Sequence, residues 1–595
     1  MSWPFDLNSK APRHHIGWHS KAMTTRGPLL HTRRLRFVNR NFHRLFSLRC
    51  AGETRPSQVA AEEGMGNKDD LFEYTSGRWI YNERRRLAER HLVFNVDELK
   101  KAAATAVGRP VSEIRSIRKL AEGGFNRVFD ISMKDGLSLL ARLPYPSTMP
   151  RRLAIASEVA TLAFVRACGI PAPRVLGYSA HDNPVGVEYI LMEKLPGRPI
   201  GDAWFSLPEK DRLKVLHEIV TLEAKLFANS LPASGSIYFA HDLPPGTPNV
   251  PLSDSEGLCI GPYANLRWWF NERASLDIDR GPHNDPCLVL QAPAEKELAW
   301  IRTYGKPRFP FQRAYGETLD YKKQDPDEHS NSLLEYLQLA PYLAPTCPKL
   351  NLPILRHPDL QPNNIFISED FKITGLIDWQ HSLVLPMFLA AGIPRSFQNY
   401  GDEQSMYFIP PQLPKDLGSM DADEHAIACE QFRRRHVHFF YLGFTQKLNE
   451  PHSEALEQEF GLLRRRIFDN AGSPWEGLNT PLQVDIAQVS QNWSKIAAVR
   501  SDGSLPACPV VISEQDAQKR AALDDSLRDV DTELEQIHGF LGVGSDRWTS
   551  HELFEQAKER ARSIKAEGLA AVDDDPWLRR MTEQHWPFDD YNEDE

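Results

Sequence analysis

The sequence predicts an α+β protein with two lobes, a small antiparallel β-sheet lobe followed by a large, mainly helical lobe. Residues 114–192 have the apolar patterns of three strands, a helix and two further strands, in that order. From Ile200 onward the long apolar-periodic segments have the spacing of helices. With 595 residues the chain also exceeds the size of one ordinary compact core, which favours two lobes with tails.

The small lobe is defined by its strands and by one helix. Residues 134–136 read Lys-Asp-Gly, and the Asp-Gly pair is a strong hairpin signal between two apolar segments. A helix is predicted over Leu153–Cys168 and ends at Gly169. The strands are predicted at Ile114–Leu120, Phe125–Met133, Leu137–Leu143, Val175–Tyr178 and Val187–Met192.

The flanking segments are less regular. The lead-in Asp70–Phe94 mixes aromatic and charged residues, and we expect it to pack on the small lobe. The span 240–330 is rich in Pro and Gly and is expected to hold loops and insertions, whereas 352–378 is expected to be rich in β-structure. The last fifty residues are predicted to be helical and to end in a solvated acidic tail, Asp589–Glu595. Further helices are predicted at Asn95–Val107, Asp211–Phe227 and Gln431–Leu448.

Composition excludes several classes of protein. No run of 18 or more apolar residues occurs, so a membrane-spanning helix is not supported. The seven cysteines are scattered without a Cys-x-x-Cys pair, which argues against a zinc site and a dense disulfide framework. Residues 1–52 carry a formal charge of +9, so the remainder carries −19 within a total of −10. Because an acidic body lacks the basic footprint that nucleic acid requires, we expect no nucleic-acid partner.

The N-terminal segment has the composition of a mitochondrial presequence. Between Leu7 and Gly52 there is no Asp or Glu, and Arg33–Arg49 has the pattern of a basic amphipathic helix. This predicts recognition by the mitochondrial import machinery and a location in the matrix. The alternatives are a disordered basic tail and a gene-model artefact upstream of the true start.

Two weaker signals lie in the predicted small lobe. Gly123, Gly124, Phe125 and Asn126 form a Gly-rich turn between the first two strands, where backbone amides could approach phosphate oxygens, although an ordinary hairpin turn has the same pattern. A phosphate-binding cation on the third strand needs a carboxylate partner on the following helix. Arg142 and Glu158 occupy those places, and the alternative for each is a solvated surface charge.

The strongest signal is the polar loop within Leu355–Ile367. It places His357, Asp359 and Asn364 between two apolar strands, and a third strand, Ile373–Ile377, ends on Asp378. This pattern offers one carboxylate to orient a hydroxyl group and an amide and a carboxylate to hold a metal. Amide and carboxylate oxygens are the hard ligands that Mg²⁺ takes. The alternative is a chance polar hairpin.

The loop resembles the catalytic loop of aminoglycoside phosphotransferases and choline kinases, relatives of protein kinases. Their His-x-Asp-x-x-x-x-Asn pattern is matched by His357, Asp359 and Asn364, and their later Ile-Asp-Trp by residues 377–379. The resemblance implies a protein-kinase-like fold that uses ATP and Mg²⁺ to phosphorylate a small-molecule acceptor. It implies Asp359 as the catalytic base, beside His357 in the catalytic loop, and Asn364 and Asp378 as magnesium ligands.

The stretch Ile190–Gly197 resembles the hinge of the same superfamily, whose backbone holds adenine; this implies nucleotide contacts at Met192, Glu193 and Lys194. Within the superfamily the chain is most similar to the fungal mitochondrial group of Altered inheritance of mitochondria protein 9. The matching stretches include residues 72–79, 123–129, 141–144 and 377–380, and they agree with the presequence.

One departure leaves two hypotheses open. Active kinases normally use Lys where Arg142 stands, and a forked guanidinium does not simply replace a compact ammonium group. The chain is therefore expected to be either an ATP- and Mg²⁺-dependent phosphotransferase acting on an unidentified hydroxyl acceptor or a nucleotide-binding pseudokinase scaffold in mitochondrial maintenance or inheritance.

The expected divisions are a presequence at 1–52, a linker and N-terminal extension at 53–112, the N-lobe with its nucleotide-binding loop at 113–195, the C-lobe with catalytic and metal-binding loops at 196–545, and a C-terminal helix and acidic tail at 546–595.

Overall fold

The computed structural model describes residues 71–595 apart from 254, 256, 498–502 and 594. Within this part, the small lobe is a five-stranded antiparallel sheet in the order β2-β3-β4-β6-β5. The helix α4 follows β4 in the chain and is buried on nearly every side, which explains its almost wholly apolar sequence. The elements are β2 (Ile114–Glu122), β3 (Asn126–Met133), β4 (Ser138–Pro144), α4 (Leu153–Ala167), β5 (Val175–Ser179) and β6 (Tyr189–Glu193). The predicted order of strands and helix is confirmed.

The N-terminal extension packs on this sheet, as predicted for the lead-in. Leu92 and Phe94 share one buried cluster with Phe129 and Ile131 of β3, and the rings of Phe94 and Phe129 lie 5.2 Å apart between centroids. Asn95 accepts hydrogen bonds from two backbone amides of the first turn of α3, which fixes where that helix begins. The elements of the extension are β1 (Arg78–Trp79), α2 (Glu83–Arg90) and α3 (Val96–Ala106).

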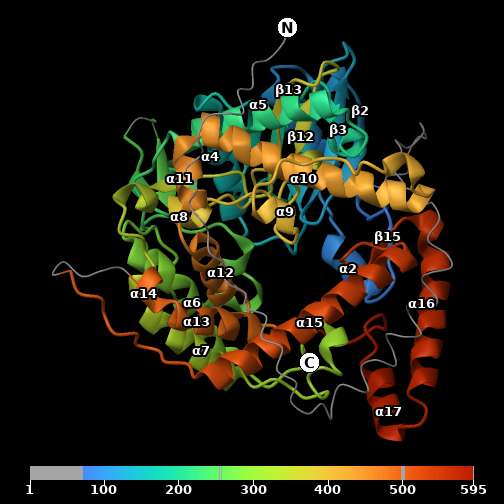
Figure 1. The fold of residues 1–595 in the computed structure, drawn as a ribbon. Coiled ribbons are helices and arrows are strands. Elements are labelled where there is room, and N and C mark those ends of the chain that lie inside the picture. The colour runs from blue at the N-terminus through green and yellow to red at the C-terminus, as the bar shows by residue number, and fades with distance from the viewer. Residues whose placement is uncertain (1–70, 254, 256, 498–502, 594) are drawn as a thin grey trace. The chain divides into compact units, whose positions relative to one another are not determined.

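The large lobe is mainly helical, as predicted (Figure 1). The long helix α10 begins nine residues earlier than predicted, because Asp421 and Glu424 form a reciprocal capping box at its start. The helices are α5 (Glu209–Phe227), α6 (Pro286–Tyr304), α7 (Pro326–Leu339), α8 (Met387–Ala390), α9 (Glu403–Met406), α10 (Ala422–Leu448), α11 (Glu450–Glu457), α12 (Gly461–Gly472), α13 (Thr480–Gln491) and α14 (Trp493–Ile496).

The expectation of loops over 240–330 was wrong in part. The 19-residue helix α6 lies inside this span, and the small sheet β8-β10-β9 begins just before it. Pro286 stands at the start of α6, where a missing N–H costs nothing, and Asp285 caps it. Pro293 lies inside the helix and disguises it in the sequence, since proline is usually a helix breaker. The strands are β8 (Ser236–Phe239), β9 (Val250–Pro251) and β10 (Leu258–Gly261).

Short strands join the two lobes to the polar loop. After β6 the chain forms β7, which pairs with β12, and β12 pairs in turn with β13. This three-stranded sheet ties the loop to the segment that leaves the small lobe, and a second pair, β11 with β14, supports the start of the loop. The strands are β7 (Arg198–Pro199), β11 (Pro353–Leu355), β12 (Ile365–Ile367), β13 (Ile373–Leu376) and β14 (Val384–Pro386).

The C-terminal region returns to the N-terminal extension. The strand β15 pairs with β1, and α16 packs against both. The elements are α15 (Glu514–Leu541), β15 (Trp548–Thr549), α16 (His551–Ala571) and α17 (Pro576–Gln584).

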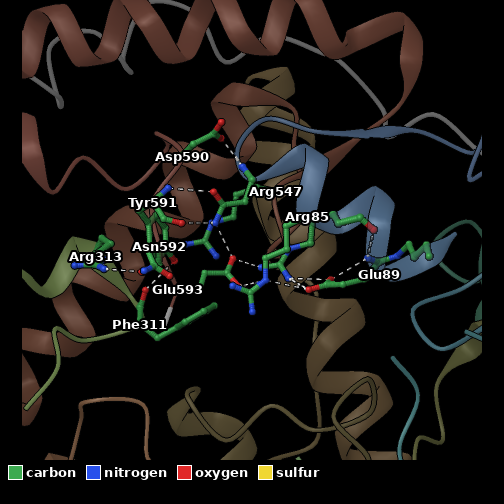
Figure 2. A network of polar contacts seen from close by, with 12 residues as sticks. Arg85, Glu89, Phe311, Arg313, Arg547, Asp590, Tyr591, Asn592 and Glu593 are labelled. Carbon is green, nitrogen blue, oxygen red and sulfur yellow. Dashed lines mark hydrogen bonds and ion pairs between the residues drawn. The ribbon is translucent and has the colours of Figure 1, made fainter. Parts of the chain in front are cut away.

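The acidic tail is solvated only in part, because Glu593 is buried whereas Asp590 and Glu595 are exposed; this corrects the prediction for residues 589–595 in part. Asn82 forms three hydrogen bonds of 2.5–3.0 Å with Asp590 and Tyr591. It donates to the Asp590 carboxylate and the Tyr591 carbonyl oxygen, and it accepts from the Tyr591 N–H. Glu593 is 7% exposed; it forms an ion pair with Arg86 and accepts a hydrogen bond from Asn82 at 2.9 Å. Figure 2 shows this tail between α2 and the segment that carries Phe311 and Arg313. The carboxylate of Glu593 is therefore paired with α2, and Arg308 and Arg313 donate to backbone carbonyl oxygens of the tail.

The ion pairs of Glu593 should stabilise the docking of the tail on α2. Replacing Glu593 with Gln should remove about 1–3 kcal/mol from the docking of the tail, the usual value of hydrogen bonds to a charged partner. Hydrogen exchange of α2 and residues 588–593 is the measurement, because local undocking is what the substitution favours. Glu583→Gln is the matched control, since Glu583 is an exposed carboxylate of the same region. Equal protection in the two variants would contradict the prediction.

Two further absences hold for the described residues. None of their helices has the length and apolar character needed to cross a bilayer. The six cysteines that lie among them are all free thiols.

Candidate functional site

The polar loop is held by hydrogen bonds between its own side chains and the following strand. His357 is 6% exposed; its Nδ1 accepts from the backbone N–H of Asp359 at 3.1 Å and its Nε2 lies 2.9 Å from the carbonyl oxygen of Ile377. Both ring nitrogens are therefore engaged, with Nε2 as the donor. Burial lowers the pKa of His357, which keeps the ring neutral in this arrangement. His357 thus fixes the backbone on both sides of the site.

Asp359 is exposed and has one oxygen in use. Its Oδ2 accepts from Gln361 Nε2 at 2.5 Å and from Asn364 Nδ2 at 3.2 Å. Asn364 Nδ2 also donates to the carbonyl oxygen of Asp359 at 2.8 Å, so the amide clamps the residue from two sides. Among the described residues, Oδ1 of Asp359 accepts no hydrogen bond.

The β12–β13 hairpin brings Asn364 and Asp378 to the same end. Ile365 lies opposite Leu376, and the N–H of Ile377 donates to the carbonyl oxygen of Asn364 at 3.0 Å. Asp378 follows directly with a left-handed backbone, φ 66°, which turns the chain out of the strand. The structure therefore brings together the loop residues and Asp378, as the sequence spacing predicted.

Arg142 reaches this place from the small lobe. It forms an ion pair with Glu158 of α4, and its second terminal nitrogen contacts Asp378 Oδ1 at 2.7 Å and Gln380 Oε1 at 2.8 Å. Asn126 completes the cluster, because its side chain hydrogen bonds with Gln380 at 2.6 Å and lies against the same guanidinium group. Residues from β3, β4, α4 and the segment after β13 thus meet at one cation.

The charges of this cluster shift one another. Burial raises the pKa of Glu158 to about 7 and outweighs the attraction of Arg142. Asp378 is less enclosed, with 43% of its side chain exposed. Its burial favours a higher pKa, but Arg142 prevails and the pKa is lowered, so this carboxylate is ionised near neutral pH.

The Gly-rich turn lies beside the cluster. The N–H of Gly123 donates to the carbonyl oxygen of Asn126 at 2.9 Å, and Phe125 at the tip is 42% exposed. Neither Gly123 nor Gly124 has a positive φ, and a Cβ at Gly124 would meet no atom within 4 Å. The backbone does not require glycine here, so these residues leave space in front of the turn.

The predicted hinge residues are arranged differently from one another. Met192 is buried in β6 opposite Leu140 of β4. The carboxylate of Glu193 accepts from the backbone N–H of Arg174 at 2.8 Å, and Lys194 donates to Asp130 of β3 at 2.9 Å. The side chains of Glu193 and Lys194 are thus used within the protein, and the backbone N–H of Glu193 donates to the carbonyl oxygen of Arg174 at 3.0 Å.

The donor set fits a magnesium ion in its chemistry. Among the described residues, Oδ1 of Asn364 accepts no hydrogen bond, and Asp378 uses only Oδ1 for Arg142. Two hard oxygens are therefore available on adjacent backbone segments. No group of three or more His, Cys, Asp or Glu that could hold a metal occurs in the described part of the chain.

A pocket of about 150 Å³ opens beside Asp359. It is lined by residues 356–361 of the loop and by residues 394–396, which follow α8. Arg356 at its base is fully engaged by Glu223, Tyr441 and a backbone carbonyl oxygen. We refer to it as the loop pocket.

Sequence reasoning missed two residues of the site. Gln380 lies next to a recognised motif, but only the fold shows that it contacts both Arg142 and Asn126. Arg395 lines the loop pocket although it lies 36 positions after Asp359, in a segment without a motif. No local pattern could have found Arg395, because chain folding alone places it.

A glycine behind the loop supports a prediction. Gly197 has φ 91°, and a Cβ there would overlap the backbone carbonyl group of Ile367 in β12. Gly197→Ala should therefore destabilise the protein by about 1–3 kcal/mol more than Gly186→Ala, which shares the positive φ, 87°, but meets no atom. Urea unfolding of the two variants separates overlap from backbone strain, and equal midpoints would contradict the prediction.

Comparison with known proteins agrees with this architecture. Residues 116–388 match the model of the phosphotransferase enzyme family. A subtelomeric hrmA-associated cluster protein of Aspergillus fumigatus is 30% identical over 508 residues, which cover 80% of this chain and 96% of that protein. Altered inheritance of mitochondria protein 9, mitochondrial, of Candida tropicalis is 25% identical over 434 residues, 63% of this chain and 69% of that protein.

Two of the solved structures that match the chain are phosphotransferases. The GDP and kanamycin complex of an aminoglycoside phosphotransferase covers 67% of this chain and 94% of its own, with 13% identity and a TM-score of 0.29. A macrolide 2'-phosphotransferase of Brachybacterium faecium covers 64% and 98%, with 14% identity and a TM-score of 0.25.

The fold and the site define a two-lobed, protein-kinase-like phosphotransferase. The chain belongs to the phosphotransferase enzyme family, together with the fungal mitochondrial group that the sequence resembles.

Proposed function

We propose that the protein is an ATP- and Mg²⁺-dependent phosphotransferase that phosphorylates a hydroxyl group of a small molecule. The observation that carries the proposal is the meeting of Asp359, Asn364 and Asp378 beside the loop pocket. Phosphoryl transfer asks for little more than positioned reactants and compensated charge, and these residue types supply both.

In this proposal Asp359 is the catalytic residue. Oδ1 takes the proton of the acceptor hydroxyl while the hydroxyl oxygen forms a bond to the γ-phosphorus. The bond between this phosphorus and the leaving ADP oxygen breaks. Gln361 and Asn364 hold the other oxygen, so the carboxylate keeps one orientation. His357 is a positioning residue, because both of its nitrogens are used to hold the backbone.

The small lobe holds the nucleotide. Gly123–Asn126 covers the phosphates and the backbone of Met192–Lys194 holds the adenine, while Arg142, fixed by Glu158, contacts the phosphate oxygens. Asn364 Oδ1 and Asp378 would hold Mg²⁺, which when bound would neutralise charge on the transferring phosphoryl group.

The proposal places the protein in the mitochondrial matrix. The relatives named as mitochondrial support a mitochondrial location, and the basic presequence at 1–52, which lies outside the described residues, is the proposed import signal. A fluorescent fusion of the full chain should enter mitochondria, whereas a fusion that lacks residues 1–52 should not. Import of the shortened fusion would contradict the assignment of the signal.

The test of activity uses labelled ATP. Purified protein is incubated with γ-labelled ATP, Mg²⁺ and a small-molecule extract, and transfer of label to a new product is measured. We expect transfer that stops when EDTA removes Mg²⁺ and falls in Asp378→Asn. Absence of both label transfer and ATP hydrolysis in the presence of Mg²⁺ would overturn the proposal.

One observation favours a nucleotide-binding pseudokinase as the second candidate. Arg142 forms an ion pair with Asp378 at 2.7 Å, so the proposed phosphate-binding cation and a proposed metal ligand are bonded to each other. This candidate predicts that nucleotide raises the melting temperature without turnover. Arg142→Lys separates the two: gained turnover indicates a degenerate enzyme, and lost nucleotide binding indicates a site built around arginine.

A further inference from the structure

The loop pocket holds an arginine that has no partner among the described residues. Arg395 lines the pocket that Asp359 also lines, and it is exposed. Among the described residues it forms no hydrogen bond and no ion pair, and its neighbours Pro394 and Phe397 are buried, which anchors its backbone. Its guanidinium group is therefore free to meet a ligand from a fixed point of the chain.

The other arginine of the lining is already paired, so Arg395 is the cation that remains for a ligand. Arg356 at the base of the pocket is neutralised by Glu223 at 2.8 Å. Arg465 of α12 does not line the pocket, and it lies within electrostatic reach of both Arg356 and Asp469. Asp359 is the one acid that lines the pocket. Arg395 is thus the one cation of the lining without a carboxylate partner among the described residues, and the single carboxylate of the lining is committed to the hydroxyl group.

The geometry points to an acceptor that carries a carboxylate or phosphate group besides its hydroxyl, with Arg395 as the residue that binds this anion. A planar guanidinium group pairs with such oxygens through two parallel hydrogen bonds. An acceptor with an ammonium group besides its hydroxyl would instead bring a like charge to Arg395. The inference rests on the proposed function, because it takes Asp359 as the group that receives the hydroxyl.

Binding provides a test that does not depend on turnover. The full protein, saturated with ADP and Mg²⁺, is titrated by calorimetry with glycerate and 3-phosphoglycerate as anionic probes, and with glycerol and choline as neutral and cationic ones. We expect the anionic probes to bind more tightly than both others. Arg395→Ala should weaken them by about 10- to 100-fold, the usual effect of losing a charge-assisted hydrogen bond.

Two variants control the measurement. Arg395→Lys keeps the charge without the fork and should lose less affinity than Arg395→Ala. Arg434→Ala removes an exposed arginine of α10 whose partner is Glu430, and it should change nothing. Since Arg395 makes no contact within the described protein, the melting temperature of Arg395→Ala should equal that of wild type. No binding of the anionic probes, tighter binding of choline, or equal affinities in wild type and Arg395→Ala would each overturn the inference.

Turnover separates this inference from the proposed function. If an extract is divided by anion exchange, the labelled product should arise from the retained, anionic fraction, with a raised KM and an unchanged kcat in Arg395→Ala. A product that arises from the unretained fraction would contradict the anionic acceptor and leave the phosphotransferase in place. Anion binding at Arg395 without any turnover would contradict the proposed enzyme and leave the anion site in place.

Discussion

Phosphoryl transfer by Asp359→Asn should fall by about 10²- to 10⁴-fold, the usual contribution of a positioned general base. Asn has the shape of Asp and can still accept hydrogen bonds from Gln361 and Asn364, so the loop should keep its conformation. It cannot take the proton of an acceptor hydroxyl. The rate of label transfer from ATP and the melting temperature, measured on the same preparation, check both halves of the prediction.

The control for this variant lies in the same hairpin. Asp370 is an exposed aspartate in the turn between β12 and β13, bonded to Ser368. Asp370→Asn makes the same chemical change at a distance from the loop pocket and should leave the rate within about twofold, since surface substitutions of this kind are usually small in effect. Equal rates in wild type and Asp359→Asn would mean that the carboxylate has no part in the reaction.

Arg142→Met should cost about 3–5 kcal/mol of unfolding free energy at pH 8, because it leaves a buried carboxylate without its partner. Glu158 is 1% exposed, and its Oε2 has no hydrogen-bond partner in the described part of the chain. Urea unfolding followed by tryptophan fluorescence measures the loss.

The loss should depend on pH in a defined direction. The pKa of Glu158 is already raised to about 7, above its ordinary value of 4.5, because of burial. A carboxyl group with a raised folded-state pKa is most stabilising below the unfolded value and loses that contribution as pH rises through the folded value. Without Arg142 the pKa rises further, so Arg142→Met should be more destabilised at pH 8 than at pH 6.

A double variant provides the control. Arg142→Met combined with Glu158→Leu removes both charges and should recover most of the stability, since apolar residues often replace a buried ion pair without loss. If the single and double variants unfold at the same urea concentration, the pairing of these two residues is not the source of the effect.

The sequence predicted the small lobe well because its signals are local. The Asp-Gly hairpin and the apolar strands around it need no distant partner, and β3 and β4 form where the pattern placed them. The loop with His357, Asp359 and Asn364 was also found, since the hairpin that carries it spans a short stretch of chain. The apolar periodicity predicted that a helix lies at α10. It did not predict where the helix starts, because the start is set by the capping box of Asp421 and Glu424.

What the sequence did not reveal depends on contacts between distant segments. Arg395 enters the loop pocket from a stretch without periodicity, and Gln380 gains its meaning only from Arg142 in another lobe. The tail carries a run of acids that would be solvated in isolation. Glu593 is nevertheless buried, because Arg86 pairs with its carboxylate and Arg308 donates to its carbonyl oxygen, and both arginines lie far away in the chain.

The pairing of β15 with β1, and of Glu593 with α2, also orders events during synthesis. Residues 78–90 emerge from the ribosome early, yet their partners lie at 548–593, so this first segment waits until translation is almost complete. Until then Tyr81, which is 4% exposed in the folded protein, lacks its contacts with the ring of Tyr591 and the guanidinium group of Arg547. A chain that passes through a membrane pore with its N-terminus first and folds afterwards would likewise expose residues 78–90 before their C-terminal partners arrive.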